Sequence, residues 1–532
     1  MKKLKLVFIV LCIGGVVSCG EKQDIKIPVD EIPSHAVEKL VTIDASTTFQ
    51  TIAGFGASDA WQPAWVGKHW TESRDRISEL LFSRDIGEGQ PKGIGLSMWR
   101  VNLGAGSAEQ GNNSGIETIS RRAESYLKEN GVYDWNSSEG QRYFMQRALQ
   151  LGVEKFILFS NSPLVQYTYN GEARSDRGGH ANLKPEHYSD FAIYMAEVAK
   201  HFTDKGFPIT HISPVNEPQY NWEGHDQEGS GWTNEEIATL VRELDKALTS
   251  RNVPSDILVG ESGDWEYFYK SKSDPARSNV IANFFNPNRE TYIGNLSHVK
   301  RLISGHSYWT DGSWDGMRLI REQVKQSAEQ YDLEVWQSEW SMIGDGYSSS
   351  EYVGHDRAGT MDIALYMSKV IHNDLTVAGV TSWSFWTAMD VAHWGHKNRF
   401  LLISLTPEGG EWGDIMSGDG TFAETPTLWV LGNYSLFIRP GFIRVKLSMN
   451  ESRSFFGSAY ISPEGNQIVA VYSNLSDKPV SLKETRTGWN NPVTVKSYTT
   501  SNFKNMEEIT WSTGSTVILD AESVTTVVYQ LN

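Results

Sequence analysis

The sequence predicts an α/β protein, namely a (β/α)8 TIM barrel with an attached side β-sandwich domain. Between residues 53 and 435, short apolar runs alternate with amphipathic helical patterns, which is typical of βαβ units and a parallel sheet. About eight such runs occur, the number that closes a barrel. Over residues 436–532, runs of β-branched residues separated by Gly, Pro and Asn indicate an antiparallel sandwich instead.

The expected barrel strands are the apolar runs of the larger part. They are residues 52–55, 95–100, 156–160, 209–215, 257–260, 302–304, 333–336 and 377–383. Amphipathic stretches such as 189–203, 234–250 and 359–373 predict the helices between them. In this fold the side chains that act on a substrate come from the carboxyl ends of the strands, so candidate residues are sought there.

The β domain is expected to include a strand from the other end of the chain. Its own strands are predicted at 468–472, 493–498, 517–519 and 524–529. The run 41–52 precedes the barrel and has no partner there, so we expect it to pair into the β domain. No long linker separates the two parts, which predicts rigid packing between them.

The first eighteen residues predict a targeting segment. Three early lysines precede the apolar run 6–17, which is short for a membrane span. The sequence around Cys19 resembles a bacterial lipobox, so we expect a signal peptide over 1–18 and a lipidated Cys19 with a tether to residue 40. The mature protein would be anchored by lipid to the outer membrane, facing the periplasm or the cell exterior. The alternative is plain secretion, with Cys19 incidental.

Composition narrows the class of partner. The net charge is −17 and no basic run follows residue 5, which argues against nucleic acid and anionic membrane surfaces. The chain carries 19 Trp, 21 Tyr and 21 Phe, side chains that suit stacking on sugar rings. The alternative is that a large barrel buries many of them in its core. Cys12 would leave with the signal peptide, so no second cysteine remains for a disulfide or a thiolate metal site.

Two segments each place a glutamate just after an apolar run. Glu217 follows 209–215 in the sequence Asn216-Glu217-Pro218, and Glu339 follows 333–336. Glycoside hydrolysis needs two carboxylates held by separate elements, one to protonate the leaving oxygen and one to attack the sugar or activate water. A chance pairing is the alternative, because the chain has 65 acidic residues. Two such segments at the expected strand ends favour the catalytic interpretation.

An ordered set of motifs resembles glycoside hydrolase family 30 over residues 41–532. The motifs are Gly54-Phe55-Gly56-Ala57-Ser58, Trp99-Arg100, Asn216-Glu217-Pro218, Gly305-His306-Ser307-Tyr308, Ser338-Glu339-Trp340, Trp383-Ser384-Phe385-Trp386 and Phe437-Ile438-Arg439-Pro440-Gly441. The resemblance implies a (β/α)8 barrel with a side β domain that hydrolyses β-glycosidic bonds with retention. It implies no cofactor and no metal.

The resemblance also implies residue roles. Glu217 would be the general acid/base and Glu339 the nucleophile. Arg100 and Asn216 would hold the nucleophile and the sugar 2-hydroxyl, Tyr308 would hydrogen-bond the nucleophile, and Trp383 would form the floor of the sugar site. Retention places the two carboxyl groups about 5–5.5 Å apart. We expect the first to carry a proton and the second to be ionised beside the guanidinium.

Further residues near strand ends are candidates for sugar contact, with ordinary packing or capping as the alternative. They are Trp61, Asp59, Asn161, His306 and Trp222. The acidic residues Glu261, Asp264 and Glu266 predict a solvated loop, with a distal subsite as the alternative. His393 and His396 lie three residues apart, but two ligands are too few for a metal site.

The substrate expectation is a β-1,6-galactan, such as the side chains of arabinogalactan. The segment 56–61 resembles the branch of the family that contains endo-β-1,6-galactanases. Residues 160–168 lack the Trp that family members often carry, and only Arg100 and Arg399 offer positive charge for a uronic acid. The alternatives are a β-1,6-glucanase or xylanase of the same family, or a non-catalytic glycan-binding lipoprotein. We expect the protein to be a monomer and its partner to be a polysaccharide or oligosaccharide.

Overall fold

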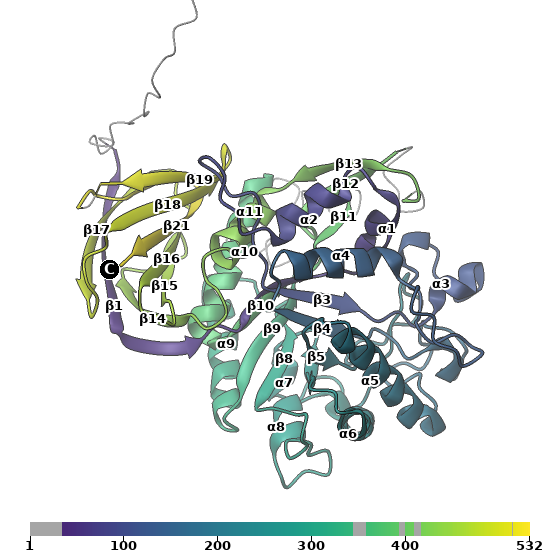
Figure 1. The fold of residues 1–532 in the computed structure, drawn as a ribbon. Coiled ribbons are helices and arrows are strands. Elements are labelled where there is room, and N and C mark those ends of the chain that lie inside the picture. The colour runs from purple at the N-terminus through teal and green to yellow at the C-terminus, as the bar shows by residue number, and fades with distance from the viewer. Residues whose placement is uncertain (1–34, 344–357, 393–398, 409–415, 513, 532) are drawn as a thin grey trace, which may run out of the picture.

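A computed structural model describes residues 35–343, 358–392, 399–408, 416–512 and 514–531 (Figure 1). The predicted signal peptide, Cys19 and most of the predicted tether lie outside the described residues, as do His393 and His396. None of the helices within these ranges is both long enough and apolar enough to cross a membrane.

A closed barrel of parallel strands forms the larger part of the molecule. Its strands are β2 (Gly54–Ser58), β3 (Met98–Asn102), β4 (Lys155–Phe159), β5 (Ile209–Ser213), β6 (Asp256–Ile257), β7 (Gly260–Ser262), β8 (Leu302–His306), β9 (Glu334–Trp340) and β10 (Ser382–Phe385). They are hydrogen-bonded in the order β6-β5-β4-β3-β2-β10-β9-β8-β7. Because β6 and β7 follow each other along the chain as two halves of one strand, the sheet closes and the predicted (β/α)8 barrel is confirmed.

Helices surround the barrel on its outside (Figure 1). They are α1 (Gln62–His69), α2 (Arg74–Phe82), α3 (Ser107–Gln110), α4 (Glu139–Gln150), α5 (Tyr188–Asp204), α6 (Asn234–Arg251), α7 (Glu266–Tyr269), α8 (Val280–Phe285), α9 (Trp314–Glu329), α10 (Thr360–Asn373) and α11 (Pro426–Ser435). Short helical turns are η1 (Gly111–Ser114), η2 (Ile119–Arg121), η3 (Val165–Tyr167), η4 (Pro185–His187), η5 (Pro275–Arg277) and η7 (Asp374–Ala378).

Helix α6 illustrates how the local sequence sets these elements. Thr233 and Glu236 form a capping box that satisfies free backbone N–H groups at the first turn. Apolar residues spaced three and four apart turn one face toward the barrel, where it is buried. Asn252 ends the helix in a left-handed conformation, which Asn tolerates better than most residues. The observed helix covers the predicted stretch 234–250.

The barrel interior is filled by alternate residues of the strands. One buried cluster joins side chains from strands around the barrel: Met98, Ile157, Leu258, Leu302 and Trp336. Side chains two positions apart on a strand share a face. Arg100, two residues after Met98, therefore faces the same interior at the carboxyl end, as does Ser338 on β9.

The smaller part is a mostly antiparallel β domain. It comprises β1 (Val37–Thr51), β14 (Ile443–Met449), β15 (Phe455–Ile461), β16 (Gln467–Asn474), β17 (Val480–Thr487), β18 (Thr494–Ser501), β19 (Lys504–Trp511), β20 (Ile518–Leu519) and β21 (Ser523–Gln530). β1 runs antiparallel to β14 and parallel to β17, then leads directly into the barrel. All nine strands are hydrogen-bonded into one sheet around a separate apolar core.

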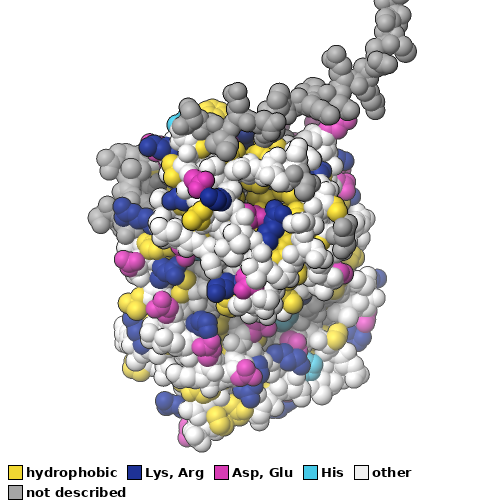
Figure 2. All heavy atoms as spheres, turned by 90° about the vertical axis from the view of Figure 1, so that its left-hand side faces the viewer, with side chains coloured by type: hydrophobic (Ala, Val, Ile, Leu, Met, Phe, Trp, Pro, Cys, Tyr) yellow, Lys and Arg dark blue, Asp and Glu magenta, His cyan; other side chains and the backbone are white. Residues whose placement is uncertain are grey.

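Helices α10 and α11 lie between the barrel and the β domain (Figure 1). Buried Asn433 of α11 donates to the carbonyl of Tyr498 and to the hydroxyl of Thr526, both in the β domain. A third small sheet, β11 (Met389–Val391), β12 (Ile403–Pro407) and β13 (Gly420–Glu424), follows β10. On the face of the β domain shown in Figure 2, Lys and Arg side chains are interspersed with Asp and Glu, so no charge of one sign dominates there.

Candidate active site

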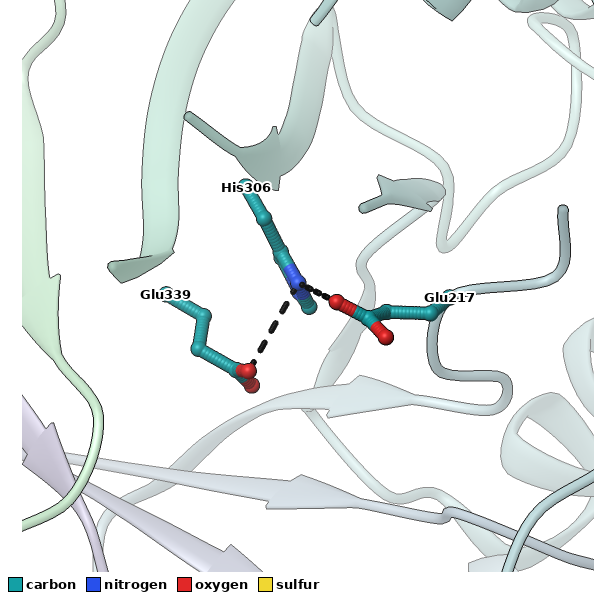
Figure 3. A group of neighbouring side chains, drawn as sticks. All are labelled: Glu217, His306 and Glu339. Atoms are coloured by element: carbon teal, nitrogen blue, oxygen red, sulfur yellow. Dashed lines mark hydrogen bonds and ion pairs between the residues drawn. The ribbon is translucent and has the colours of Figure 1, made fainter. Parts of the chain in front are cut away.

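Two glutamates from different strands face each other at the carboxyl end of the barrel. Glu217 follows β5, and Glu339 lies near the end of β9. His306 of β8 lies between them (Figure 3). A carboxylate oxygen of Glu217, a ring nitrogen of His306 and a carboxylate oxygen of Glu339 lie within 4.8 Å of one another. An inverting glycosidase needs its carboxyl groups about 6.5–9.5 Å apart, so the spacing suits direct attack by one of them.

The Glu339 carboxylate is held at both oxygens. Arg100 Nη1 donates to Oε2 at 2.6 Å, and the hydroxyl of Tyr308 donates to Oε1 at 2.9 Å. The same guanidinium donates through Nη2 to Asn216 Oδ1 at 2.9 Å and lies 3.7 Å from the ring centroid of Phe159. The side chain of Glu339 is only 5% exposed. Its orientation is therefore fixed before any substrate arrives.

Glu217 is held less tightly and is more open. Its side chain is 14% exposed, and Oε1 accepts one hydrogen bond, from Nδ1 of His306 at 3.0 Å. The backbone of Glu217 has a positive φ of 41°, and its N–H donates to the carbonyl of Glu261 at 3.0 Å. An exposed, lightly bonded carboxyl group beside a fixed carboxylate is the arrangement expected of an acid/base and a nucleophile.

Charges inside the site determine the protonation of His306. Burial lowers its pKa, but the charge of Glu339 and hydrogen bonds to Glu217 and Glu261 outweigh burial and raise the pKa of His306 to about 10. The imidazole is then charged at neutral pH, and both ring nitrogens donate. Burial raises the pKa of Glu339 above its usual range, although the charges of His306 and Arg100 oppose this shift.

A third carboxylate belongs to the site, and its predicted place in a solvated loop is wrong. Glu261 of β7 is fully buried, not part of a solvated loop. It accepts hydrogen bonds from Arg100 Nη2 at 3.1 Å and from His306 Nε2 at 3.2 Å. The signal that was missed is Gly260, because its φ of +112° breaks the strand and turns the next residue inward.

Three expected sugar contacts are corrected. Trp383 is fully buried, and its indole N–H donates to Asp374 at 2.9 Å. The reason is strand alternation: Ser382 and Ser384 face the barrel interior, so Trp383 faces the helices. Asp59 is also fully buried and accepts from Asn102 N–H and Gln141. His306 uses both ring nitrogens on carboxylates and has none left for a sugar.

The remaining candidates are Trp222, which contacts Glu217, and Asn161 and Trp61, which contact other residues that follow or end barrel strands. Trp222 donates its indole N–H to the carbonyl of Glu217 at 3.3 Å and is 5% exposed. Asn161 donates to Asn102, and its own side-chain oxygen has no partner among the described residues. Trp61 packs edge-on against Trp386, with ring centroids 5.2 Å apart. Contact of these three side chains with sugar stays a prediction.

Exposed aromatic residues that the sequence analysis did not single out also follow barrel strands. Trp309, after β8, is 55% exposed and directly follows Tyr308. Tyr220, after β5, is 44% exposed, and its N–H donates to the carbonyl of Glu217. Their signal in the sequence is an aromatic residue five positions after the end of an expected strand, 209–215 for Tyr220 and 302–304 for Trp309. Exposed aromatic faces beside a polar centre suit stacking on sugar rings.

A cavity of about 200 Å³ is lined by neither of the paired glutamates. Helices α1 and α4 and the segment 119–124 surround it, and its wall includes Trp61, Trp65 and Gln141. Mixed aromatic and polar walls are typical of pockets for small polar ligands. A chain of contacts connects this wall to the site: Trp61 packs against Trp386, Trp386 against Phe159, and the guanidinium of Arg100 lies over the Phe159 ring.

The group Glu217, His306 and Glu339 is the only cluster among the described residues that offers three metal ligands. The donor set does not fit a metal ion, because a guanidinium already binds the carboxylate of Glu339 and the imidazole is held as a cation.

The class of protein follows from the two glutamates at the carboxyl end of the (β/α)8 barrel. One carboxylate is held at both oxygens and the other is partly exposed, which is the arrangement of a glycoside hydrolase.

The family follows from comparison with known proteins. The model of O-glycosyl hydrolase family 30 matches residues 38–397. The match spans more than half of the chain, so the chain belongs to O-glycosyl hydrolase family 30 and hydrolyses β-linked glycan. The resemblance drawn from the motifs is thereby confirmed.

Relatives in the family differ in the glycan named for them. An endo-β-1,6-galactanase of Hypocrea rufa is 26% identical over 375 residues, covering 67% of this chain and 68% of the relative. Glucuronoxylanase XynC of Bacillus subtilis (strain 168) is 24% identical over 444 residues, covering 83% and 79%. The crystal structure of a conserved exported protein from Bacteroides fragilis has a TM-score of 0.85 and 30% identity, covering 92% of this chain and all of that one.

Proposed function

We propose that the protein is a retaining glycosidase in which Glu339 is the nucleophile and Glu217 the general acid/base. The observation that carries the proposal is the unequal support of the two carboxyl groups. Arg100 and Tyr308 hold both oxygens of Glu339, whereas Glu217 is more exposed and accepts a single side-chain hydrogen bond.

Both steps of the reaction use these two groups. Glu339 attacks the anomeric carbon while Glu217 gives its proton to the departing glycosidic oxygen, which leaves a glycosyl ester on Glu339. Glu217, now a carboxylate, then takes a proton from water as the water displaces the ester. Arg100 and Tyr308 stabilise the carboxylate of Glu339 as it departs.

Rescue by azide tests the two roles separately. Glu217→Ala should lose most activity on substrates with a poor leaving group. On a substrate with a good leaving group, which departs without a proton, it should form the glycosyl ester and turn over with azide, giving a β-glycosyl azide. Glu339→Ala should be rescued by azide to the α-glycosyl azide, because azide then attacks the face of the sugar that the Glu339 carboxylate would have attacked. Glu266→Ala is the matched control, since this carboxylate lies on α7 and pairs with Lys270 just after that helix. The opposite pattern of products would exchange the two roles, and no loss in either variant would reject them.

We further propose a β-1,6-galactan as the substrate. Support comes from the galactanase of Hypocrea rufa and from the segment 160–168, which carries no Trp to narrow the site. The glucuronoxylanase matches a longer part of the chain, which favours glucuronoxylan as the second candidate.

A panel of polysaccharides separates the candidates. De-arabinosylated arabinogalactan should release galacto-oligosaccharides, and β-1,6-glucan and glucuronoxylan should release far less product at equal enzyme concentration. Product analysis by chromatography and mass spectrometry measures all three. Turnover confined to glucuronoxylan or β-1,6-glucan would remove galactan as the substrate. Binding without turnover on every glycan would favour a non-catalytic receptor.

We also propose that Cys19 is lipidated and anchors the protein to the outer membrane. The lipobox-like sequence supports this location, as does the name of the relative from Bacteroides fragilis, a conserved exported protein. In a bacterial host, labelled palmitate should enter the wild-type chain and not the Cys19→Ser variant, which should leave the membrane fraction. Equal labelling of both would disprove the anchor.

A further inference from the structure

Glu261 touches both cations of the active site. Its Oε2 accepts from Arg100 Nη2 at 3.1 Å and from His306 Nε2 at 3.2 Å. The hydroxyl of Ser304 donates to Oε1 at 2.6 Å, and that of Ser338 donates to Oε2 at 3.2 Å. With four donors and no exposed surface, this carboxylate is stable only in its charged form, and its pKa lies near 2 because His306 and Arg100 outweigh the opposing effect of burial.

The two cations reach the catalytic carboxylates with their other donors. Arg100 Nη1 donates to Glu339, and His306 Nδ1 donates to Glu217 at 3.0 Å. The carbonyl of Glu261 also accepts from the backbone N–H of Glu217 at 3.0 Å. Both of these residues have positive φ, 43° for Glu261 and 41° for Glu217, so this backbone hydrogen bond joins two unusual conformations.

We infer that Glu261 is a positioning residue, whose buried carboxylate holds Arg100 and His306 as the two cations that orient the catalytic pair. The inference rests on the proposed roles of Glu217 and Glu339. It extends them by assigning a function to a third carboxylate on β7 that would touch no substrate.

The charge balance of the cluster explains why the third carboxylate is needed. Arg100 and His306 carry two positive charges, and the carboxylates of Glu261 and Glu339 balance them. Without Glu261, two buried cations would face one ionised carboxylate, and the imidazole would release its proton. His306 would then offer Glu217 a lone pair or a single N–H, and Glu339 would lose part of the positive field around it.

The groups that face His306 come from four strands. They are the carboxylates of Glu217 after β5, Glu261 on β7 and Glu339 on β9, and the ring of Tyr308, which follows strand β8. Arg100 of β3 binds the carboxylates of Glu261 and Glu339. Only Glu261 can be neutralised among the three glutamates without removing a proposed acid or nucleophile, so it is the residue to change.

The test compares the full-length wild type with Glu261→Gln, which keeps the shape and removes the charge. Glu261→Gln should lower kcat about 100-fold with a much smaller change in KM. Glu261→Asp, which keeps the charge on a shorter side chain, should recover part of the loss. Glu266→Gln is the control, because this carboxylate lies five residues away on α7 and pairs with Lys270 and Lys272.

The decisive readout is the titration of His306. In histidine-labelled protein its NMR signal can be identified by its absence in His306→Gln. The wild-type imidazole should remain doubly protonated through pH 8, and Glu261→Gln should move its titration at least two pH units lower. A purely structural role would lower the melting temperature without moving this titration.

Each outcome decides the inference. Wild-type kcat in folded Glu261→Gln, or a His306 titration that does not move, would overturn it. If Glu261→Gln does not fold, the wild type alone suffices, because a neutral His306 at pH 7 would also overturn it. The NMR measurement needs no substrate, so it stays informative even if the proposed glycan or the proposed catalytic roles fail.

Discussion

Tyr308 and Arg100 divide the work of fixing Glu339, and their contributions can be measured separately. Tyr308→Phe removes the hydroxyl that donates to Oε1 and leaves the guanidinium on Oε2. A hydrogen bond to a charged group contributes about 1.5–3 kcal/mol, so kcat/KM should fall about 10- to 150-fold. Tyr194→Phe is the control, because this buried hydroxyl donates to the carbonyl of Gly104 instead. Equal kcat/KM for Tyr308→Phe and the wild type would exclude any role of the hydroxyl.

The pKa of Glu339 predicts the acid limb of the pH profile. Burial raises that pKa above its ordinary value of 4.5. A nucleophile must be ionised to attack, so activity should be present above the raised pKa and lost as the pH falls through it. The apparent pKa of the acid limb of kcat/KM should therefore exceed 4.5. A profile that stays flat down to pH 4 would contradict this assignment.

The folded pKa of His306 predicts a second pH effect, on stability. Its pKa rises from 6.5 in the unfolded chain to about 10 in the folded one. The charged imidazole therefore stabilises the fold fully below pH 6.5, and this contribution is lost as the pH rises toward 10. Calorimetry should show a melting temperature that falls between pH 7 and 10 in the wild type and falls less steeply in His306→Gln. Parallel curves would mean that His306 is not charged in the folded protein.

At the scale of single elements, the break between β6 and β7 places Glu261 in the site. The φ of Gly260 is +112°, and a Cβ there would lie 2.4 Å from the carbonyl oxygen of Ser304. Gly260→Ala should therefore combine backbone strain with a clash and lower both the melting temperature and kcat. Gly379→Ala separates the two effects, because Gly379 also has a positive φ of +74° but open space around it.

The control should lose about 1–2 kcal/mol of stability from strain alone and keep its kcat. Gly260→Ala should lose more stability than the control, and its kcat should fall because the strand can no longer turn Glu261 inward. Melting temperatures and initial rates on one substrate measure both quantities. Equal effects of the two substitutions would show that the bend at Gly260 has no part in the site.

The elements also show what a sequence can predict. Apolar runs identified most barrel strands because parallel strands are buried on both faces, although the run 377–383 reaches β10 only with its last two residues. Glu217 and Glu339 were found because each comes at or just after the end of such a run. Glu261 was missed, since the expected strand 257–260 ends at Gly260, whereas the positive φ of Gly260 breaks the strand there and turns Glu261 inward. Trp383 was misplaced because a strand of four residues gives too little alternation to show which side faces the interior.

The substrate could not be derived in the same way. Loops after the strands shape the sugar site, and their course depends on contacts between segments far apart in the chain. Trp61, for example, meets Trp386 more than 300 residues away. Sequence motifs predicted the chemistry because a few strand-end residues carry it, whereas the shape of the pocket is set by the whole ring of loops.

At the scale of the whole molecule, β1 and α11 join the barrel to the β domain. Asn433 is fully buried, donates to Tyr498 and Thr526, and accepts from Thr500 at 2.7 Å. Asn433→Leu would leave these partners unsatisfied, so the melting temperature should fall by several degrees while unfolding stays a single transition. Asn505→Leu, at an exposed position of β19, should change the melting temperature little. Two separate transitions in the wild type would show that the domains unfold independently.

Trapping of the glycosyl ester tests most directly whether Glu339 forms a covalent bond to the sugar. A 2-deoxy-2-fluoro glycoside of the sugar released in the glycan panel, with a good leaving group, should inactivate the enzyme because the fluorine slows hydrolysis of the ester. Mass spectrometry of the digested protein should then find the sugar on the peptide that contains Glu339, and on none in Glu339→Gln. A label on Glu217 or elsewhere, or an inverted anomer as the first product, would contradict the account.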